Sequence, residues 1–360
     1  MKVFLLTFLL PIFTFSLTVS AADLSSELQT TSRDAEFAEL MSKLNFNAEG
    51  IRLTYKDGGT SVGLKIDQGN EKLGKWLPRN SAGDPESQVV SYQLGRFLSM
   101  SELVMPSAYY KLDGAALSIF QKMLQSSRET NRWRRENRDL NLAAIAQNPS
   151  GLTGVFTPYL EPKSEEVIGL ANPSANTINS ADPIARFIRA DGPAPSASRR
   201  MSLRGIKGGN ESELELARQF SQIMVLDILT GQWDRWSGGN VEAATDGSRV
   251  YFVARDNGGA SMSGPGTFAK YSRIVTRFDR DQIQRLERLV QLLSDRDQLA
   301  ELAAALHLSS DPRSFYSTAR RLYWLLFAPR PRNMATPLTL QPAKAAGRCA
   351  VVSVHRSLNP

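Results

Sequence analysis

Cysteine and histidine are almost absent from this chain of 360 residues, which has one cysteine and two histidines. The single thiol, Cys349, cannot form an intramolecular disulfide, a CxxC metal site or an iron–sulfur cluster. His307 lies in an Ala-Leu run and His355 lies near the last residue, so neither suits a histidine-rich zinc site or a Ser-His-Asp triad. The fold must therefore rest on its apolar core, and any chemistry must come from other side chains.

Composition places the chain among globular proteins of one large or two ordinary domains. Apolar residues make up 42% of the sequence, which excludes disorder throughout, collagen and coiled-coil rods. Lysine and arginine number 43 against 36 aspartates and glutamates, giving a net charge of +7. This modest excess favours anionic partners such as nucleotides, acidic polymers or membrane faces without selecting one.

The first 21 residues predict an export signal. Met1-Lys2 precedes an almost unbroken apolar stretch from Val3 to Val19, and small residues follow at a cleavage site ending at Ala21. The stretch is short for a stable membrane span, although an uncleaved anchor is the alternative. No other segment approaches that length, so we expect a mature chain without a transmembrane segment. Its compartment would be the periplasm, the exterior or a secretory lumen.

Hydrophobic periodicity predicts a strand-rich first half and a helical second half. The order begins with a helix at 35–46, an antiparallel meander at 51–55, 62–66 and 73–77, a helix opened by Pro85, and a strand at 107–112. It continues with a helical region at 115–147, a strand at 154–160, a loop or lid at 172–212, a helix at 213–230, and helices at 279–294, 296–307 and 311–327. A Pro-rich basic tail at 329–360 ends the chain.

The helical region at 115–147 carries a basic run from Arg128 to Arg138 that includes Trp133. Basic residues around an aromatic side chain are able to bind an anionic polymer. Acidic residues are interleaved with them, however, which favours a solvated helix face.

Three oxygen-bearing side chains are brought together after the helix at 213–230. Asp234 and Asn240 lie on one loop, and a predicted hairpin with its turn at Asp246-Gly247 returns the chain to Asp256. Asp and Asn oxygens are hard ligands that suit Mg²⁺ or Mn²⁺ and leave room for phosphate oxygens. The remaining aspartate is able to accept a proton from an attacking hydroxyl, which is the division of labour in phosphoryl transfer.

This constellation resembles the protein-kinase-like superfamily. It is most similar to the atypical secretory-pathway kinases of the Golgi casein kinase type and their bacterial relatives, and more distantly to the phosphatidylinositol kinases. The family pattern D-x-L-x-G-x-x-D-R-H-x-x-x-N, then a strand and D-N-G, is matched by Asp227 to Trp236 and by Asp256 to Gly258, with Trp236 replacing the histidine. Each half alone is typical of an ordinary loop or turn, so the conjunction carries the resemblance.

The resemblance implies an α+β, two-lobed kinase-like fold, with an antiparallel-sheet N-lobe at 35–160 and a mostly helical C-lobe at 161–328. It implies Asp234 as catalytic base, Asn240 and Asp256 as metal ligands, and ATP with Mg²⁺ or Mn²⁺ as cofactor. It also implies a buried structural role for Asp227. Arg235, Asn257 and Gly258 are likewise expected to have structural roles.

The N-lobe departs from the family pattern at two positions. Leu77 stands in the slot of the phosphate-binding lysine, so Lys75, on the same strand face, or Arg79 would replace it. Gln88 stands where the family has the glutamate that pairs with that lysine, and Tyr159 lies on the connector expected to contact adenine. We expect Trp233 and Trp236 to be packing residues, in preference to platforms for a substrate.

These features lead to three alternatives. The first is an exported, metal-dependent phosphotransferase that uses ATP to phosphorylate a hydroxyl of a protein, sugar or lipid. The second is a nucleotide-binding pseudokinase that acts as a non-catalytic binding or regulatory protein, because Leu77 and Gln88 interrupt the pattern. The third is an envelope protein that binds anionic polymers through the arginines at 128–138 and 199–204. Nucleic acid is not an expected partner.

Overall fold

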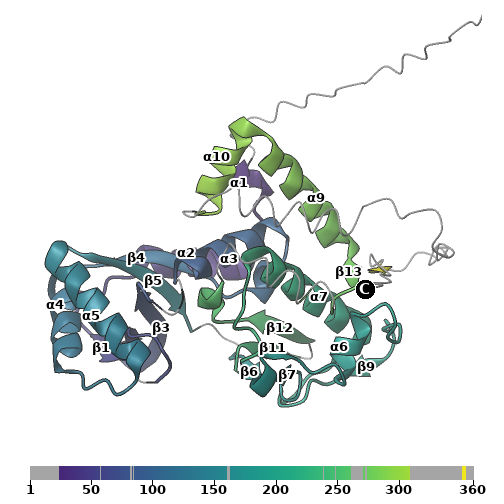
Figure 1. Ribbon diagram of the computed structural model, residues 1–360, viewed down its shortest axis with the longest axis horizontal. Helices are drawn as coiled ribbons and strands as arrows, with labels where there is room; N and C mark the ends of the chain where they lie inside the picture. Colours follow the sequence, from purple (N-terminus) through teal and green to yellow (C-terminus); the bar gives the residue numbers. More distant parts are fainter. Residues whose placement is uncertain are drawn as a thin grey trace, which may run out of the picture.

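The computed structural model describes residues 24–56, 58–81, 83, 85–159, 163–237, 239–247, 249–260, 271, 274–308 and 351–353. The predicted signal peptide, the predicted helix at 311–327 and the predicted tail, apart from 351–353, lie outside these residues. Two lobes are apparent: a β-sheet with α4 and α5 on one side, and α7 with the β11–β12 hairpin on the other (Figure 1).

A five-stranded antiparallel sheet forms the N-lobe, in the order β1-β2-β3-β5-β4. The first three strands form the predicted meander because their apolar residues alternate and glycines stand in the connections. The strands are β1 (Ile51–Tyr55), β2 (Leu64–Gln68), β3 (Glu71–Pro78), β4 (Ala108–Leu112) and β5 (Leu152–Pro158).

Two helices inserted between β4 and β5 cover one face of this sheet (Figure 1). They are α4 (Gly114–Ser126) and α5 (Arg132–Gln147), so the predicted helical region at 115–147 is interrupted. The second helix begins where the Asn131 side chain accepts hydrogen bonds from two backbone amides, at 2.8 and 3.4 Å. The insertion is anchored by the ring of Phe120, which meets Trp76 of β3 edge-on at 5.3 Å.

On the N-terminal side, α1 (Leu24–Glu27) and α2 (Ser32–Lys43) precede the sheet, and α3 (Glu86–Phe97) follows β3. The hydroxyl of Tyr92 on α3 donates to Asp34 on α2 at 2.6 Å. A short 3-10 helix, η2 (Ser101–Leu103), leads from α3 towards β4. Buried residues cover most of α3, which packs between the sheet and the second lobe.

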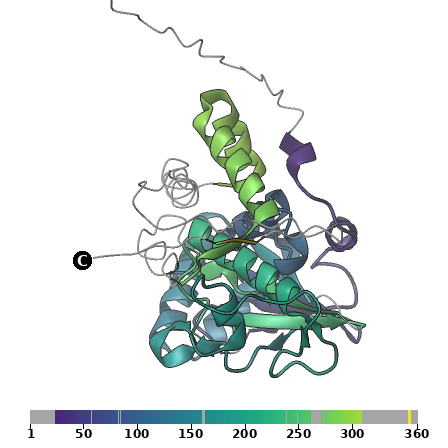
Figure 2. The same cartoon turned by 90° about the vertical axis from the view of Figure 1, so that its right-hand side faces the viewer.

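The C-lobe is organised around α7 (Glu213–Thr230), whose bounds agree with the predicted helix. It ends because Gly231 adopts a left-handed conformation with φ 68°. The predicted hairpin follows as β11 (Val241–Asp246) and β12 (Arg249–Ala254), with β6 (Glu165–Glu166) added to β11. Farther along, α9 (Arg280–Ser294) and α10 (Arg296–Ala305) project away from both lobes (Figures 1 and 2).

The segment predicted as a loop or lid is instead built from short paired elements. It contains two short pairs of antiparallel strands. Arg199 forms an ion pair with Glu213 at 2.8 Å. Sequence periodicity could not reveal strands of two residues. The elements are β7 (Ala171–Asn172), η3 (Pro173–Ala175), β8 (Thr177–Ile178), α6 (Pro183–Phe187), β9 (Arg200–Met201) and β10 (Glu211–Ser212).

One backbone and one side-chain hydrogen bond join the two lobes next to η4 (Asn257–Gly259). The amide of Met105 donates to the carbonyl of Ala254 at 3.3 Å, and Ser87 at the start of α3 donates to the carbonyl of Ala260 at 2.7 Å. The last described pairing joins β13 (Arg277–Asp279) to β14 (Val351–Ser353). Within the described ranges, no helix is long and apolar enough to cross a membrane.

Candidate functional site

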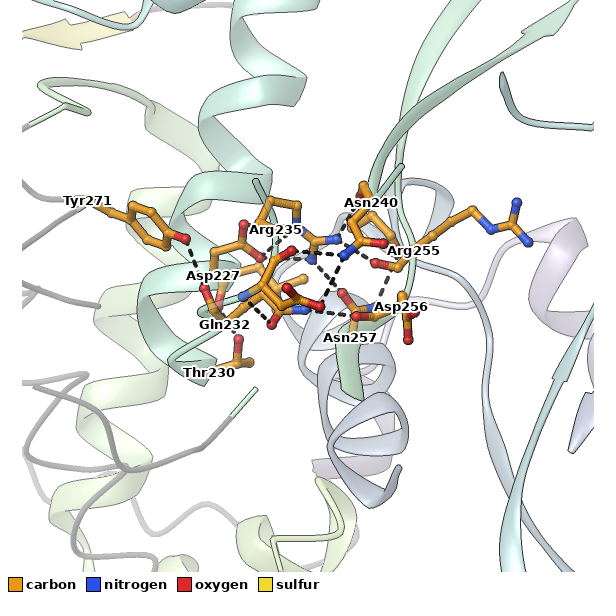
Figure 3. Close-up of polar contacts among 12 residues, drawn as sticks. Asp227, Thr230, Gln232, Arg235, Asn240, Arg255, Asp256, Asn257 and Tyr271 are labelled. Atoms are coloured by element: carbon orange, nitrogen blue, oxygen red, sulfur yellow. Dashed lines mark hydrogen bonds and ion pairs between the residues drawn. The ribbon is translucent and has the colours of Figure 1, made fainter. Parts of the chain in front are cut away.

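A buried ion pair lies at the base of the candidate site. α7 places Asp227 inside the C-lobe, and the turn after Gly231 brings Arg235 back against it (Figure 3). The guanidinium donates to the two carboxylate oxygens at 3.0 and 2.9 Å, and the side chains are 0% and 1% exposed. Such a pair fixes geometry because any movement would leave a buried charge uncompensated.

Arg235 also holds three other parts of the chain. One nitrogen donates to the backbone carbonyl of Asn240 at 3.0 Å and to that of Arg255 at 2.5 Å. Another donates to the side-chain oxygen of Asn257 at 2.5 Å. Figure 3 shows Arg235 at the centre of these contacts, with the Arg255 guanidinium pointing away from them. The loop after α7 and the end of the hairpin are therefore fixed to one buried side chain.

Gln232 is a further positioning residue that the sequence did not single out. Its amide nitrogen donates to the carbonyl of Asp256 at 2.9 Å, and its amide oxygen accepts from the backbone of Asp234 at 3.3 Å. A side chain at Gly259 would bring a Cβ to 2.4 Å from the Gln232 amide oxygen and 2.8 Å from the Cβ of Asp234. Only glycine allows this approach, which keeps Asp234 and the segment after Asp256 in contact.

Asn240 and Asp234 interact directly. The amide nitrogen of Asn240 donates to the backbone carbonyl of Asp234 at 2.8 Å and to its carboxylate at 3.4 Å. Both side chains are partly exposed. Because the nitrogen is committed to Asp234, the Asn240 amide oxygen remains an acceptor, as a hard metal ligand must be.

The backbone of Asp256 adopts a strained conformation directly before η4. Its backbone is left-handed, with φ 49° and ψ 53°, which is unfavourable for a residue with a side chain. The side chain is exposed, and within the described part of the chain its carboxylate makes no hydrogen bond or ion pair. The conformation is supported by the hydrogen bond from Gln232 to the Asp256 carbonyl at 2.9 Å, and strained backbone of this kind is common at functional positions.

Lys56 of the N-lobe lies close enough to Asp256 for their charges to interact, and Lys75 lies close to Lys56. Lys75 on β3 is opposite Lys65 on β2 and Thr157 on β5, so their side chains share one face of the sheet. Lys56 follows β1. Burial and the charge of Lys75 lower the pKa of Lys56, whereas the charge of Asp256 opposes this shift. Lys56 was missed at the sequence level because a single lysine beside glycines carries no distinctive signal.

The other predicted N-lobe residues are arranged differently. Gln88 is buried and accepts a hydrogen bond from Thr157 at 3.1 Å, and no contact between Gln88 and Lys75 is seen. Arg79 is exposed, and its backbone carbonyl accepts from Asn141 at 3.0 Å. Tyr159 is 37% exposed just after β5, where burial raises its pKa. The structure therefore places Lys75 near Gln88 through Thr157 but leaves Arg79 at the surface.

The two tryptophans of the loop differ. Trp236 is fully buried and meets Phe220 edge-on at 5.8 Å, so the packing prediction is confirmed for this residue. Trp233 is 48% exposed, and the packing prediction is wrong for it. The surroundings differ, because Trp236 packs among the rings of Phe220 and Tyr271 whereas Trp233 lies at the surface, where its carbonyl accepts from Asn176 at 3.0 Å.

The donor set fits a hard divalent cation with few protein ligands. Among the described residues, no group of three or more His, Cys, Asp or Glu could hold a metal ion. Asp256 offers an exposed carboxylate, and Asn240 offers an amide oxygen. Mg²⁺ is commonly held by one or two carboxylates together with substrate phosphates and water, which agrees with this small set.

Comparison with known proteins shows the fold. No family model matches the chain, and no curated protein matches it. Among solved structures, the chain is similar to the crystal structure of the Golgi casein kinase, with 14% sequence identity and a TM-score of 0.50. The match covers 82% of this chain and 75% of that chain. The α+β kinase-like fold predicted from the sequence is confirmed.

Proposed function

We propose that this protein is an exported, metal-dependent phosphotransferase that uses ATP and acts on a hydroxyl group. The main support is the arrangement around Arg235. One buried guanidinium binds Asp227, the backbone of Asn240 and the side chain of Asn257, so that Asp234, Asn240 and Asp256 lie on adjoining segments of a kinase-like fold. The atypical secretory-pathway kinases are the proposed relatives, in preference to the phosphatidylinositol kinases.

In the proposed reaction, the acceptor oxygen forms a bond to the γ-phosphorus of ATP while the bond from that phosphorus to the bridging oxygen breaks. ADP leaves with the bonding electrons, and the hydroxyl proton passes to the carboxylate of Asp234. Asn240 orients this carboxylate through its amide nitrogen. Positioning and charge neutralisation supply most of the catalysis in such transfers.

Asn240 and Asp256 would hold Mg²⁺ or Mn²⁺, which neutralises phosphate charge when bound. Lys75 and Lys56 would attract the phosphates from the N-lobe, and Tyr159 would lie beside the base of the nucleotide. Gln88 would contribute through Thr157 and not through an ion pair.

The test compares Asp234→Asn with Asp246→Asn in the purified mature protein. Asp246 is an exposed carboxylate on the β11–β12 hairpin, so it controls for the loss of one negative charge. With labelled ATP and Mn²⁺ or Mg²⁺, we expect Asp234→Asn to lower phosphate transfer, or slow ATP hydrolysis, at least about 100-fold. Nucleotide affinity should change little in either variant. Equal turnover by Asp234→Asn and wild type would refute the assignment of the base.

A nucleotide-binding pseudokinase is the second candidate. It is favoured by the burial of Leu77 and by the bond between Gln88 and Thr157, which replace the usual lysine–glutamate pair of the N-lobe. This candidate predicts a nucleotide-induced rise in melting temperature without turnover. A binding protein for anionic polymers has less support, because Arg134, Arg199 and Arg138 pair with neighbouring carboxylates.

A further inference from the structure

Helix α5 places a row of buried polar side chains against the N-lobe sheet. Arg134, Asn137 and Asn141 are 7%, 0% and 0% exposed, although they belong to a helix whose mean hydropathy is polar. Their spacing of three and four residues aligns them on one face. The basic run was predicted as a solvated face, and Arg134 is the exception because its side chain turns inward.

Arg134 holds the connection between β1 and β2, residues 56–63, which we call the β1–β2 loop. Its guanidinium donates to the backbone carbonyls of Lys56, Gly58 and Ser61 at 3.0, 3.0 and 2.9 Å. Glu129 fixes the same guanidinium from the other side, at 2.5 and 2.8 Å, and accepts from the hydroxyl of Tyr55 at 2.8 Å.

Asn137 joins this loop to the connection between β3 and α3, residues 79–85, which we call the β3–α3 loop. Its amide nitrogen donates to the carbonyl of Thr60 at 2.9 Å and to Asn80 at 2.7 Å. Its amide oxygen accepts from the backbone of Ser81 at 2.6 Å and from the Ser81 hydroxyl at 2.9 Å. A buried, fully bonded amide of this kind fixes both loops in one arrangement.

The β3–α3 loop lies against the chain that follows Asp256, and the β1–β2 loop begins at a lysine proposed to bind phosphate. A Cβ on Gly83 of the β3–α3 loop would lie 2.7 Å from the carbonyl of Gly258, which is two residues after Asp256. The β1–β2 loop begins at Lys56. The polar row of α5 therefore fixes N-lobe segments that adjoin the residues proposed to bind metal and phosphate.

We propose that α5 is a built-in clamp, in which Arg134 and Asn137 are positioning residues that hold the β1–β2 and β3–α3 loops ready for nucleotide phosphates. The proposal rests on the proposed nucleotide-binding function. It assigns this role to the α4–α5 insertion, which also covers the sheet. Loops fixed in the bound arrangement lose less conformational entropy when a ligand binds, so a clamp of this kind raises affinity.

The test uses Arg134→Gln with Arg132→Gln as its matched control. Arg132 is on the same helix, is exposed, and contacts only its neighbours on that helix among the described residues: Glu136 at 2.7 Å and the ring of Trp133 at 5.8 Å. Glu129→Gln is a milder second variant that keeps Arg134 but weakens its anchor. Two measurements are made on the full mature chain: amide hydrogen exchange in both loops, and affinity for fluorescent ATP.

We expect Arg134→Gln to accelerate exchange in both loops and to weaken ATP binding about tenfold, with Arg132→Gln unchanged. Any turnover should show a raised KM for ATP with kcat within about twofold of wild type. Unchanged exchange in Arg134→Gln and Glu129→Gln would overturn the clamp. Faster exchange with unaltered ATP affinity would overturn the positioning role. If wild type binds no nucleotide, the proposed function fails, and the exchange data still decide whether α5 holds the loops.

Discussion

The carboxylate of Asp227 and the guanidinium of Arg235 meet by hydrogen bonds of 3.0 and 2.9 Å in the interior of the C-lobe. Burial alone would lower the pKa of Arg235, but the charge of Asp227 and its hydrogen bonds raise it. The arginine therefore stays charged, and besides its bonds to Asp227 it donates to Asn240, Arg255 and Asn257. The pair is the structural base on which the candidate site is assembled.

Loss of this ion pair should lower the stability of the folded protein. We expect Asp227→Asn to lower the free energy of unfolding by about 3–5 kcal/mol, because Arg235 is left buried without its counter-charge. Urea denaturation at neutral pH measures the loss. Lys43→Met removes an ion pair whose side chains are 70% and 65% exposed, and it should cost no more than about 1 kcal/mol. Similar losses in the two variants would contradict the structural role of Asp227.

Asp256 should be replaceable without loss of stability. Asp256→Gly removes an exposed carboxylate and relieves a left-handed backbone, so the free energy of unfolding should stay within about 1 kcal/mol of wild type. Nucleotide binding in the presence of Mn²⁺ should weaken at least about tenfold, since a charged ligand is lost. Ser99→Gly, at another left-handed residue with φ 57°, serves as control for strain relief and should leave binding unchanged. Intact Mn²⁺-dependent binding in Asp256→Gly would exclude this aspartate as a ligand.

Mutation can distinguish which basic side chains of the N-lobe bind the phosphates of ATP. Lys75→Met and Lys56→Met should each weaken ATP binding about tenfold, because each would remove a charge-assisted contact proposed for the phosphates. Arg79→Met should change it less than about twofold, since this side chain is exposed and its residue is held through its backbone. Isothermal titration with ATP and Mg²⁺ gives the three affinities. The reverse order would move the phosphate site to Arg79.

The ion pair between Glu129 and Arg134 predicts a dependence of stability on pH. Hydrogen bonding to Arg134 lowers the pKa of Glu129 below its ordinary value of 4.5. A lowered folded-state pKa contributes stability that is fully present above the unfolded value and is lost as the pH falls through the folded value. The difference in free energy of unfolding between wild type and Glu129→Gln should therefore be constant from pH 7 to about pH 5 and shrink below pH 4.5. Urea denaturation across this range measures it, and a difference that grows towards acid would contradict the pairing.

Much of the fold could be predicted because its signals are local. The helix at 213–230 and the hairpin around Asp246-Gly247 follow from apolar spacing and turn chemistry, and both agree with the structure. The proximity of Asp234, Asn240 and Asp256 followed from the hairpin that returns the chain. Their chemical roles remain predictions that the variants above test.

The polar network of the N-lobe could not be predicted in the same way. Arg134 reaches carbonyls more than 70 residues earlier in the sequence, and nothing in the run 128–138 marks it as the buried member. The contact between Gln88 and Thr157 spans a similar separation. In the C-lobe, the side chain of Gln232 bonds to the backbone carbonyl of Asp256, which no sequence pattern marks. Side-chain contacts of this range depend on the packed sheet, which exists only after folding.

The bonds from Met105 to Ala254 and from Ser87 to Ala260 have a mechanical consequence. They tie the beginning of α3 and the approach to β4 to the chain on either side of Asn257. If one lobe rotates relative to the other while these hydrogen bonds persist, the rotation axis passes near them. The strands of the N-lobe sheet that lie far from this axis would then move the most.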